Sequence, residues 1–311
     1  MDSSKDRPAD QRNGVVVAGL DRSPWSRNAA HWAAAEAACR KATLLLVHAY
    51  LLPGVGEPEG DEFDDAITVT RMRGAELLAD VAMQVRGSHP GVPVDTRLVH
   101  ADAVTALREA SAGAALTVVG SRRAGRVSDV VSGSVAMTIA STNPAPVAVI
   151  PARRQGEGQG SIVVGVDDSP TSDPALAFAF ETAAIWRAGL VAVRSWNNVR
   201  VDAAVPVHDM IIDKNAIDRD EQLELAARLR VWQRRFPDVA VRRAVARGRP
   251  APSLLHFAPN ARLIVVGSRG PRPLHRSASR LDQSHADRPR QLPGGDCPLP
   301  GRRSSDASRG D

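Results

Sequence analysis

The sequence predicts an α/β protein built from two tandem, open, doubly wound parallel sheets, each covered by helices on both faces. The main observation is an internal repeat: residues 15–24 (VVVAGLDRSP) return as residues 162–170 (IVVGVDDSP), with an offset of 146 residues. A second echo pairs residues 116–122 (LTVVGSR) with 263–269 (LIVVGSR), 147 residues apart. This period matches the size of one autonomous domain and is far longer than a solenoid repeat, so we predict a duplicated domain.

Short aliphatic runs alternate with longer alanine-rich segments in the first half of the chain, which is typical of strand-helix-strand units. Residues 44–47 (LLLV) are apolar on both faces, as a strand covered by helices on both sides requires. Ser23 and Pro24 mark the start of the first helix, a hydroxyl cap followed by a proline. The first domain, residues 14–150, is therefore expected to hold strands at 15–20, 43–48, 94–99, 116–119 and 146–150, with helices at 26–40, 65–85, 102–111 and 134–142.

A polar, glycine-rich segment, residues 151–160 (PARRQGEGQG), is expected to link the two domains. The second domain, residues 161–270, repeats the helix-start signal at Ser169 and Pro170. Its expected strands lie near 161–166, 190–195, 239–244 and 263–266, and its helices near 172–187, 217–235 and 251–258. Because four strands are expected against five, we predict that this copy lacks the last helix and the last strand.

The chain changes character after Gly270. Residues 271–311 contain no Val, Ile, Phe, Met, Trp or Tyr, and such a segment cannot bury enough apolar surface to fold. It is either a genuine disordered extension or the product of a shifted reading frame. We favour the frame shift, because a strong repeat stops within a motif. Residues 1–13 form a polar segment before the first domain.

The charge of the chain does not indicate a nucleic-acid partner. The net charge is +5 at pH 7, and residues 271–311 hold eight arginines and five aspartates, so three of these charges belong to the tail. The two-domain body is close to neutral and has no basic helix with interleaved aromatic residues. The sequence also has no run of roughly 18 apolar residues and no apolar signal core at its start. We therefore expect a cytoplasmic protein with no nucleic-acid or membrane partner.

Candidate ligand-binding residues follow the first and fourth expected strands of domain one. Asp21 comes directly after the first strand, and the carboxyl ends of the strands form the ligand edge of a doubly wound sheet. The fourth strand leads into a glycine-rich loop, residues 120–133, and a helix start at Ser134. Glycines let backbone N–H groups face an anion, and a helix N-terminus adds its positive dipole end, so this pattern predicts a phosphate cradle. The loop lacks the Gly-Lys-Ser/Thr of a Walker A motif, which argues against a P-loop NTPase.

These motifs make the chain resemble the universal stress proteins of the ATP-binding bacterial type, over about residues 14–270. The first strand of that family ends in Gly-x-Asp-x-Ser, as residues 19–23 (GLDRS) and 165–169 (GVDDS) do here. The family's nucleotide signature is a glycine, two residues, a glycine, nine residues, a glycine and Ser or Thr. Three of the four positions match in domain one, where they hold Gly120, Arg123, Gly133 and Ser134. The resemblance implies a Rossmann-like, adenine nucleotide alpha hydrolase-like fold.

The resemblance also implies that domain one binds ATP, with or without Mg²⁺. The aspartate of the family lies near the nucleotide, the chain after the second strand contacts adenine, and the glycine loop holds the phosphates. Carried over, these contacts are Gly19, Asp21, Ala49, Gly120, Ser121, Arg122, Arg123, Ala124, Gly125, Arg126, Gly133, Ser134 and Val135. Arg123 departs from the pattern: it either obstructs ATP or grips its phosphates, and at a positive φ it would cost about 1 kcal/mol.

Domain two keeps only part of this pattern. Its implied nucleotide contacts are Gly165, Asp167, Gly267, Ser268, Arg269 and Gly270. Arg280 and Leu281 stand where the later glycine and the hydroxyl belong. The second nucleotide signature is therefore incomplete, because its later glycine and hydroxyl residue are missing from this sequence.

Three functions remain open. The resemblance favours an ATP-binding regulator of the stress or dormancy response that acts through nucleotide-dependent conformation and association. The alternative is a protein-interaction scaffold of the same fold that binds no nucleotide, which Arg123 and the broken second signature support. The third is slow ATP hydrolysis, but the histidines have no metal-ligand spacing and no nucleophile elbow is present, so no catalytic or metal site is assigned. The last strand commonly builds the dimer contact in the family, which implies a homodimer or a pairing of the two domains.

Overall fold

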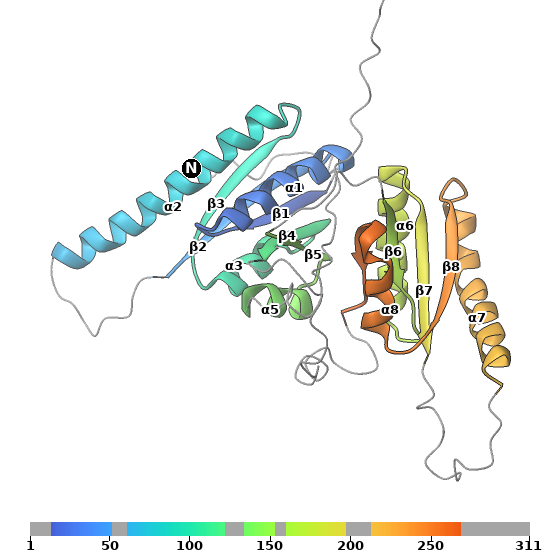
Figure 1. Cartoon of the computed structure of the whole chain (residues 1–311). Helices are drawn as coiled ribbons and strands as arrows, with labels where there is room; N and C mark the ends of the chain where they lie inside the picture. The colour runs from blue at the N-terminus through green and yellow to red at the C-terminus, as the bar shows by residue number, and fades with distance from the viewer. Residues whose placement is uncertain (1–13, 52–60, 122–133, 153–159, 197–212, 269–311) are drawn as a thin grey trace, which may run out of the picture.

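Two parallel sheets make up the protein in the computed structural model, which describes residues 14–51, 61–121, 134–152, 160–196 and 213–268 (Figure 1). The strand order is β3-β2-β1-β4-β5 in the first sheet and β8-β7-β6-β9 in the second. In each sheet the chain first runs outward on one side of its first strand and then continues on the other side. The switch points therefore lie between β1 and β4 and between β6 and β9, and the predicted doubly wound α/β class is confirmed.

The first sheet has five strands, and the predicted elements of domain one are confirmed with small shifts at their ends. They are β1 (Val15–Leu20), α1 (Pro24–Arg40), β2 (Thr43–Tyr50), α2 (Asp61–Ser88), β3 (Val94–His100), α3 (Ala103–Ala110), β4 (Leu116–Ser121), α5 (Ser134–Thr142) and β5 (Val147–Pro151). Helices α1 and α2 cover one face, which buries Leu44 and Leu46 of β2 (Figure 1). Helices α3 and α5 cover the other face, where Val17 and Val119 pack. Both faces are buried, which explains the continuous aliphatic runs of the strands.

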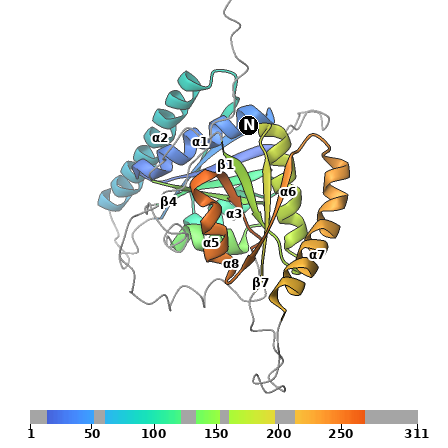
Figure 2. The ribbon, with the colours of Figure 1, turned by 45° about the vertical axis from the view of Figure 1, so that its right-hand side comes forward.

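The second sheet has four strands within the described residues, as expected. Its elements are β6 (Ser161–Gly165), α6 (Ser172–Trp186), β7 (Leu190–Trp196), α7 (Lys214–Arg235), β8 (Val241–Arg247), α8 (Pro250–Phe257), the short 3₁₀ helix η3 (Ala258–Asn260) and β9 (Ala261–Val265). Figure 2 shows α6 and α7 on one side of this sheet and α8 on the other. The expected strand at 239–244 begins later, because the N–H of Val239 closes a turn onto the Phe236 carbonyl. The tail after Gly270 lies outside the described residues.

Helices α1 and α6 pack against each other and join the two domains. Buried side chains of both domains belong to one apolar cluster, which includes Trp32 and Trp186. These two rings meet edge to face with their centroids 6.3 Å apart. The Arg40 guanidinium lies 5.3 Å from the centroid of the Phe178 ring. We call this surface the α1–α6 contact; it is made by Trp32, Glu36, Arg40, Phe178, Thr182 and Trp186.

A buried carboxylate lies at the centre of the α1–α6 contact. Glu36 is 3% exposed, and it accepts hydrogen bonds from Arg40 Nε at 2.5 Å and from Trp186 Nε1 at 2.8 Å. Arg40 also donates to Thr182 Oγ1 at 3.0 Å. Positions 36 and 182 are 146 residues apart, as are 40 and 186, so the two bonds that cross between the helices are related by approximate two-fold symmetry. Because an unpaired buried charge is costly, Glu36 depends on a donor from each domain.

Asp102 forms the N-terminal cap of α3. Its Oδ1 accepts from the backbone N–H groups of Val104 and Thr105, both at 3.0 Å. Hydrogen bonds from the Thr105 side chain and backbone hold the pKa of the Asp102 carboxyl below its usual range. A lowered folded-state pKa means that this stabilisation is present above the unfolded-state pKa and is lost as the pH falls through the folded-state pKa.

We therefore expect Asp102→Ala to lower the Tm at neutral pH, with a difference from the native chain that shrinks as the pH falls below the ordinary pKa of an aspartate, about 4. Thermal unfolding at several pH values measures this. Asp102→Asn is the control, because asparagine also caps helices but carries no charge. Asp102→Asn should keep most of the stability at neutral pH, and the difference in Tm between Asp102→Asn and Asp102→Ala should not change with pH. A difference for Asp102→Ala that does not change with pH would contradict the assignment.

Candidate functional site

The carboxyl edge of the first sheet begins with a tight turn at Asp21, between β1 and α1. Asp21 Oδ1 accepts from the backbone N–H of Ser23 at 2.9 Å and from the Ser23 hydroxyl. Ser23 caps α1 by accepting from the N–H of Ser26 at 3.2 Å, and Ser26 Oγ donates to the Asp21 carbonyl at 2.8 Å. The Gly-x-Asp-x-Ser motif thus has a structural role, because it places the start of α1 next to the end of β1.

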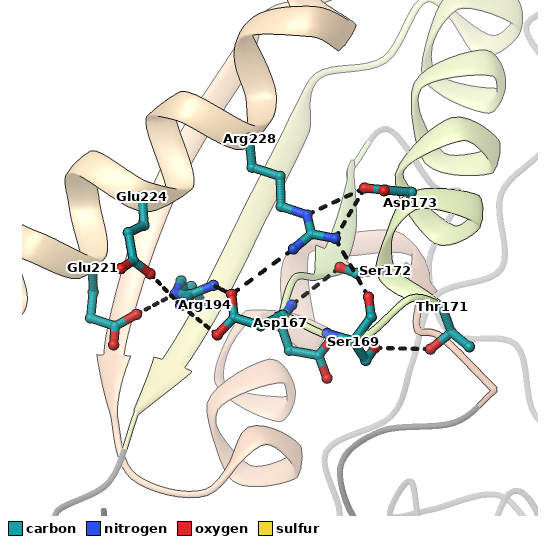
Figure 3. Close-up of polar contacts among 10 residues, drawn as sticks. Asp167, Ser169, Thr171, Ser172, Asp173, Arg194, Glu221, Glu224 and Arg228 are labelled. Atoms are coloured by element: carbon teal, nitrogen blue, oxygen red, sulfur yellow. Dashed lines mark hydrogen bonds and ion pairs between the residues drawn. The ribbon is translucent and has the colours of Figure 1, made fainter.

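A turn with the same aspartate–serine hydrogen bonds follows β6 in domain two, at Asp167 (Figure 3). The predicted helix start at Ser169 and Pro170 is wrong, because α6 begins at Ser172 and its N-cap is Thr171. Asp167 Oδ1 accepts from the N–H of Ser169 at 3.0 Å and from its hydroxyl at 2.5 Å. The Asp167 N–H donates to Ser172 Oγ at 3.2 Å, and the hydroxyls of Ser169 and Thr171 are 3.0 Å apart. The two aspartates therefore occupy matching turns. Their contacts with a nucleotide stay predictions.

Glycine is needed at the end of β4 because the first turn of α1 passes directly over it. A Cβ at Gly120 would lie 2.6 Å from the Trp25 carbonyl oxygen and 2.9 Å from the Ser26 nitrogen, both backbone atoms. In domain two a Cβ at Gly267 would lie 2.6 Å from Thr171 Oγ1. The sequence predicted that these glycines allow an anion to approach the backbone. The structure adds that each glycine allows the carboxyl end of its own strand to approach the start of a helix.

Other predicted nucleotide contacts within the described residues, Gly19, Ala49 and Gly165, pack at the ends of β1, β2 and β6. A Cβ at Gly19 would lie 3.1 Å from the Leu107 side chain of α3, so this glycine lets α3 approach the sheet. Gly165 has the same relation to Leu254 of α8, at 3.2 Å. Ala49, near the carboxyl end of β2, packs on the face covered by α3 and α5. The preceding residue is structural, since His48 Nδ1 donates to the Leu20 carbonyl at 2.8 Å.

The phosphate loop of domain one is described only at its two ends. Ser121 is buried at the end of β4, and α5 begins with Ser134 and Val135. Because α5 runs back toward the start of β5, its N-terminus and its positive dipole end lie at the carboxyl edge of the sheet. In domain two, Ser268 is exposed and ends the described part of the chain. The remaining predicted contacts lie outside the described residues: Arg122, Arg123, Ala124, Gly125, Arg126, Gly133, Arg269 and Gly270.

An ion-pair cluster that was not predicted from the sequence lies at the carboxyl edge of domain two (Figure 3). We call it the Arg194 clamp; it consists of Asp168, Arg194, Glu221 and Glu224. The Arg194 nitrogens Nη1 and Nη2 donate to the two carboxylate oxygens of Asp168 at 2.9 Å and 3.0 Å. Nε donates to Glu221, and Nη2 donates to Glu224 at 2.7 Å. The signal in the sequence was an arginine within the otherwise apolar start of a strand, residues 190–194 (LVAVR).

Charge pairing keeps the Arg194 guanidinium ionised. Burial by itself would lower the pKa of Arg194, but the hydrogen bonds and charges of Asp168 and Glu221 outweigh it and raise the pKa above its ordinary value. Within the described part of the chain, no group of three His, Cys, Asp or Glu residues could hold a metal ion. The carboxylates of the clamp are arranged around the arginine.

A cavity of about 530 Å³ lies at the opposite end of the second sheet. Its lining includes Ser161, Leu190 and Val241, which begin β6, β7 and β8, and Phe257 at the end of α8. This is the amino end of the strands, so the cavity shares no residue with the predicted ligand edge. Among the helices of the described residues, none is both long and apolar enough to cross a membrane.

Comparison with known proteins identifies the family of both halves. The model of the universal stress protein family matches residues 13–151 and 160–288. Universal stress protein Rv1996 of Mycobacterium tuberculosis is 33% identical over 279 residues, which cover 84% of this chain and 88% of the relative. Universal stress protein Rv2623 of the same organism is 35% identical over 276 residues, covering 83% and 86%.

The fold comparison agrees with the sequence comparison. The crystal structure of a universal stress protein from Archaeoglobus fulgidus has a TM-score of 0.59 to this chain at 16% sequence identity. The match covers 86% of this chain and 89% of that one, so it extends over both sheets. With a tandem match to one family model and relatives that are similar over most of their length, the chain belongs to the universal stress protein family.

Proposed function

We propose that this protein binds ATP at the carboxyl edge of domain one and acts as a regulator of the stress or dormancy response. Membership of the family supports the stress role. The observation that carries the binding site is the position of Asp21, Gly120 and the N-terminus of α5, which all lie at the switch point between β1 and β4. A phosphate at this edge would lie before the N-terminus of α5, where backbone N–H groups and the helix dipole favour an anion.

We further propose that nucleotide acts by changing conformation and association rather than by rapid turnover. Hydrolysis needs a group that activates water. Asp21 is the acidic residue at this edge that the family motif singles out, and its Oδ1 already accepts two hydrogen bonds from Ser23. A carboxylate in this position is better suited to accept hydrogen bonds from the turn and from a ligand than to take a proton from water.

One observation favours the alternative of a scaffold that binds no nucleotide. The α1–α6 contact joins the domains through side chains of this chain alone, and its buried Glu36 has protein donors on both sides. Such a contact needs no ligand. Calorimetric titration of the full chain with ATP, with and without Mg²⁺, separates the two functions, because a scaffold would show no saturable heat.

We expect Asp21→Ala to weaken ATP binding by about tenfold or more, because it removes the carboxylate at the ligand edge. Ser23→Ala is the matched control, since it also removes two hydrogen bonds of the turn, the hydroxyl bond to Asp21 and the cap bond from the Ser26 N–H, and keeps the carboxylate. Both variants should lower the Tm to a similar extent, and Ser23→Ala should keep the ATP affinity within about twofold of native. Equal affinity losses in both variants would assign Asp21 a structural role. Absence of ATP binding by the native chain would contradict the proposed function.

A further inference from the structure

The ligand edges of the two domains differ in charge at matched positions. The residues compared are related by the 146-residue offset of the first repeat. Arg22, Arg27 and His48 of domain one are matched by Asp168, Asp173 and Arg194 of domain two. Strand pairing supports the last match, because Gly19 is level with Val47 in the first sheet and Gly165 is level with Val193 in the second. Two basic side chains near the start of α1 are thus replaced by acidic ones near the start of α6.

One ion pair shows the exchange directly. Arg27 of α1 lies 2.6 Å from Asp80 of α2, whereas Asp173 of α6 lies 3.1 Å from Arg228 of α7. The Arg27 hydrogen bond lowers the pKa of the Asp80 carboxyl, so this pair is ionised at neutral pH. Corresponding helices are joined in each domain, but the acidic partner is on the helix that follows the first strand of the sheet only in domain two.

The Arg194 clamp ties the turn after β6 to α7 (Figure 3). Arg194 is 5% exposed, and it holds Asp168 of the turn together with Glu221 and Glu224 of α7. Arg228 of α7 adds a second tie, because its Nη2 donates to the Ser169 carbonyl at 3.4 Å and its Nη1 lies 3.9 Å from Asp168 Oδ1. The carboxyl ends of β6 and β7 are therefore bridged by side chains of the protein itself.

The charge around the clamp is unfavourable for a phosphate. Among the described residues drawn in Figure 3, two guanidinium groups, of Arg194 and Arg228, stand beside the five carboxylates of Asp167, Asp168, Asp173, Glu221 and Glu224, which leaves three negative charges in excess within this set. To bind a phosphate, the buried Arg194 would have to give up its bidentate pair with Asp168 or its bonds to Glu221 and Glu224. The phosphate would also meet these carboxylates at close range, and like charges repel.

We propose that the Arg194 clamp closes the carboxyl edge of domain two to anionic nucleotides, so that the chain takes up a single nucleotide, in domain one. The statement about domain one rests on the proposed function. The statement about the clamp depends only on the contacts of Arg194.

A double-mutant cycle tests the clamp without any nucleotide. The variants are Asp168→Asn, Arg194→Met and the double variant, and the equilibrium constant of unfolding is measured in urea. We expect the equilibrium constant of unfolding of the double variant to be about tenfold smaller than the value obtained by multiplying the effects of the two single variants. Arg194→Lys, which keeps the charge but not the bidentate geometry, replaces Arg194→Met if the latter does not fold. The exposed pair Arg235 and Glu181, 3.9 Å apart, is the control and should couple by less than about twofold. If the substitutions at positions 168 and 194 change the equilibrium constant of unfolding independently, the proposed coupling between Asp168 and Arg194 is overturned.

Titration of the native chain with ATP tests the closed edge. We expect one equivalent of ATP per chain, bound about tenfold or more weakly in Asp21→Ala and with unchanged affinity in Asp168→Asn. Binding of two equivalents of ATP by the native chain would overturn the proposal, as would a lower ATP affinity in Asp168→Asn. A native chain that binds no ATP contradicts the proposed function instead, and the double-mutant cycle still decides whether the clamp exists.

Discussion

Trp186→Ala is expected to lower the free energy of unfolding by about 3–5 kcal/mol, the usual loss for a buried tryptophan. Trp186 is 2% exposed and packs against Trp32 of the other domain, with the Arg262 guanidinium 4.2 Å from its ring centroid. It also donates to the buried Glu36 carboxylate. The variant therefore loses ring packing and a donor to a buried charge at the same site. Urea denaturation of the full chain measures the change.

Two further variants separate these contributions. Trp186→Phe keeps most of the ring and loses the indole N–H, so it should cost about 1.5–3 kcal/mol through the unsatisfied Glu36 oxygen. Adding Glu36→Gln should recover part of that loss, because a neutral amide is cheaper to bury than a carboxylate. Leu223→Ala, at a side chain that is 70% exposed, should change stability by less than about 0.5 kcal/mol. A Trp186→Phe variant as stable as the native chain would contradict the role given to Glu36.

Gly120→Ala is the second substitution with a large expected effect. The new Cβ would lie 2.6 Å from the carbonyl oxygen and 2.7 Å from the carbonyl carbon of Trp25. These are backbone atoms in the first turn of α1, so either α1 or β4 must shift, at a cost of about 1–3 kcal/mol. A shift of α1 also moves the Asp21 turn, so ATP affinity should fall together with stability. Thermal unfolding and calorimetry of the same samples measure both.

Glycine substitutions elsewhere provide matched controls for this prediction. A Cβ at Gly87, near the end of α2, meets no atom within 4 Å, so Gly87→Ala should be neutral or stabilising by up to about 1 kcal/mol. A Cβ at Gly267 would lie 2.6 Å from the Thr171 hydroxyl, a side-chain atom, and 3.0 Å from the nearest backbone atom, the Thr171 carbonyl oxygen. Because the nearest backbone atom is farther away than the 2.6 Å at Gly120, the loss in Gly267→Ala should be smaller than in Gly120→Ala. If Gly120→Ala and Gly87→Ala are equally stable, the close approach of β4 and α1 is not a constraint.

The positions of the strands and helices could be predicted because they depend on local patterns. The run at 44–47 is apolar on both faces, and the structure buries β2 between two layers of helices. Ser23 and Pro24 predicted the start of α1, and Ser23 caps that helix. Asp21 was predicted at the ligand edge, but its hydrogen bonds with Ser23 were not foreseen, because the resemblance to a family directs attention to a ligand before the local turn.

The partners of buried charges could not be predicted in the same way. Glu36 lies in an alanine-rich helix and has no feature in the sequence that distinguishes it from an exposed glutamate. It is buried because α6 of the other domain packs over it and supplies the Trp186 N–H. Arg194 meets Asp168, Glu221 and Glu224, which are 26 to 30 residues away and lie on two other elements. Which charged side chains pair therefore depends on how the helices pack on the sheet.

The sequence by itself determined the duplication, the doubly wound α/β class, the order of the elements and the place of the repeated Gly-x-Asp-x-Ser motif after the first strand of each domain. These features follow from periodic burial and from hydrogen bonds between residues a few positions apart. Only the tertiary structure decided that α1 faces α6, that Gly120 lies under the Trp25 carbonyl, and that the edge of domain two is bridged by an arginine. The physical reason is that close packing and charge pairing act between segments far apart in the chain, and their positions are known only once the sheets and helices are assembled.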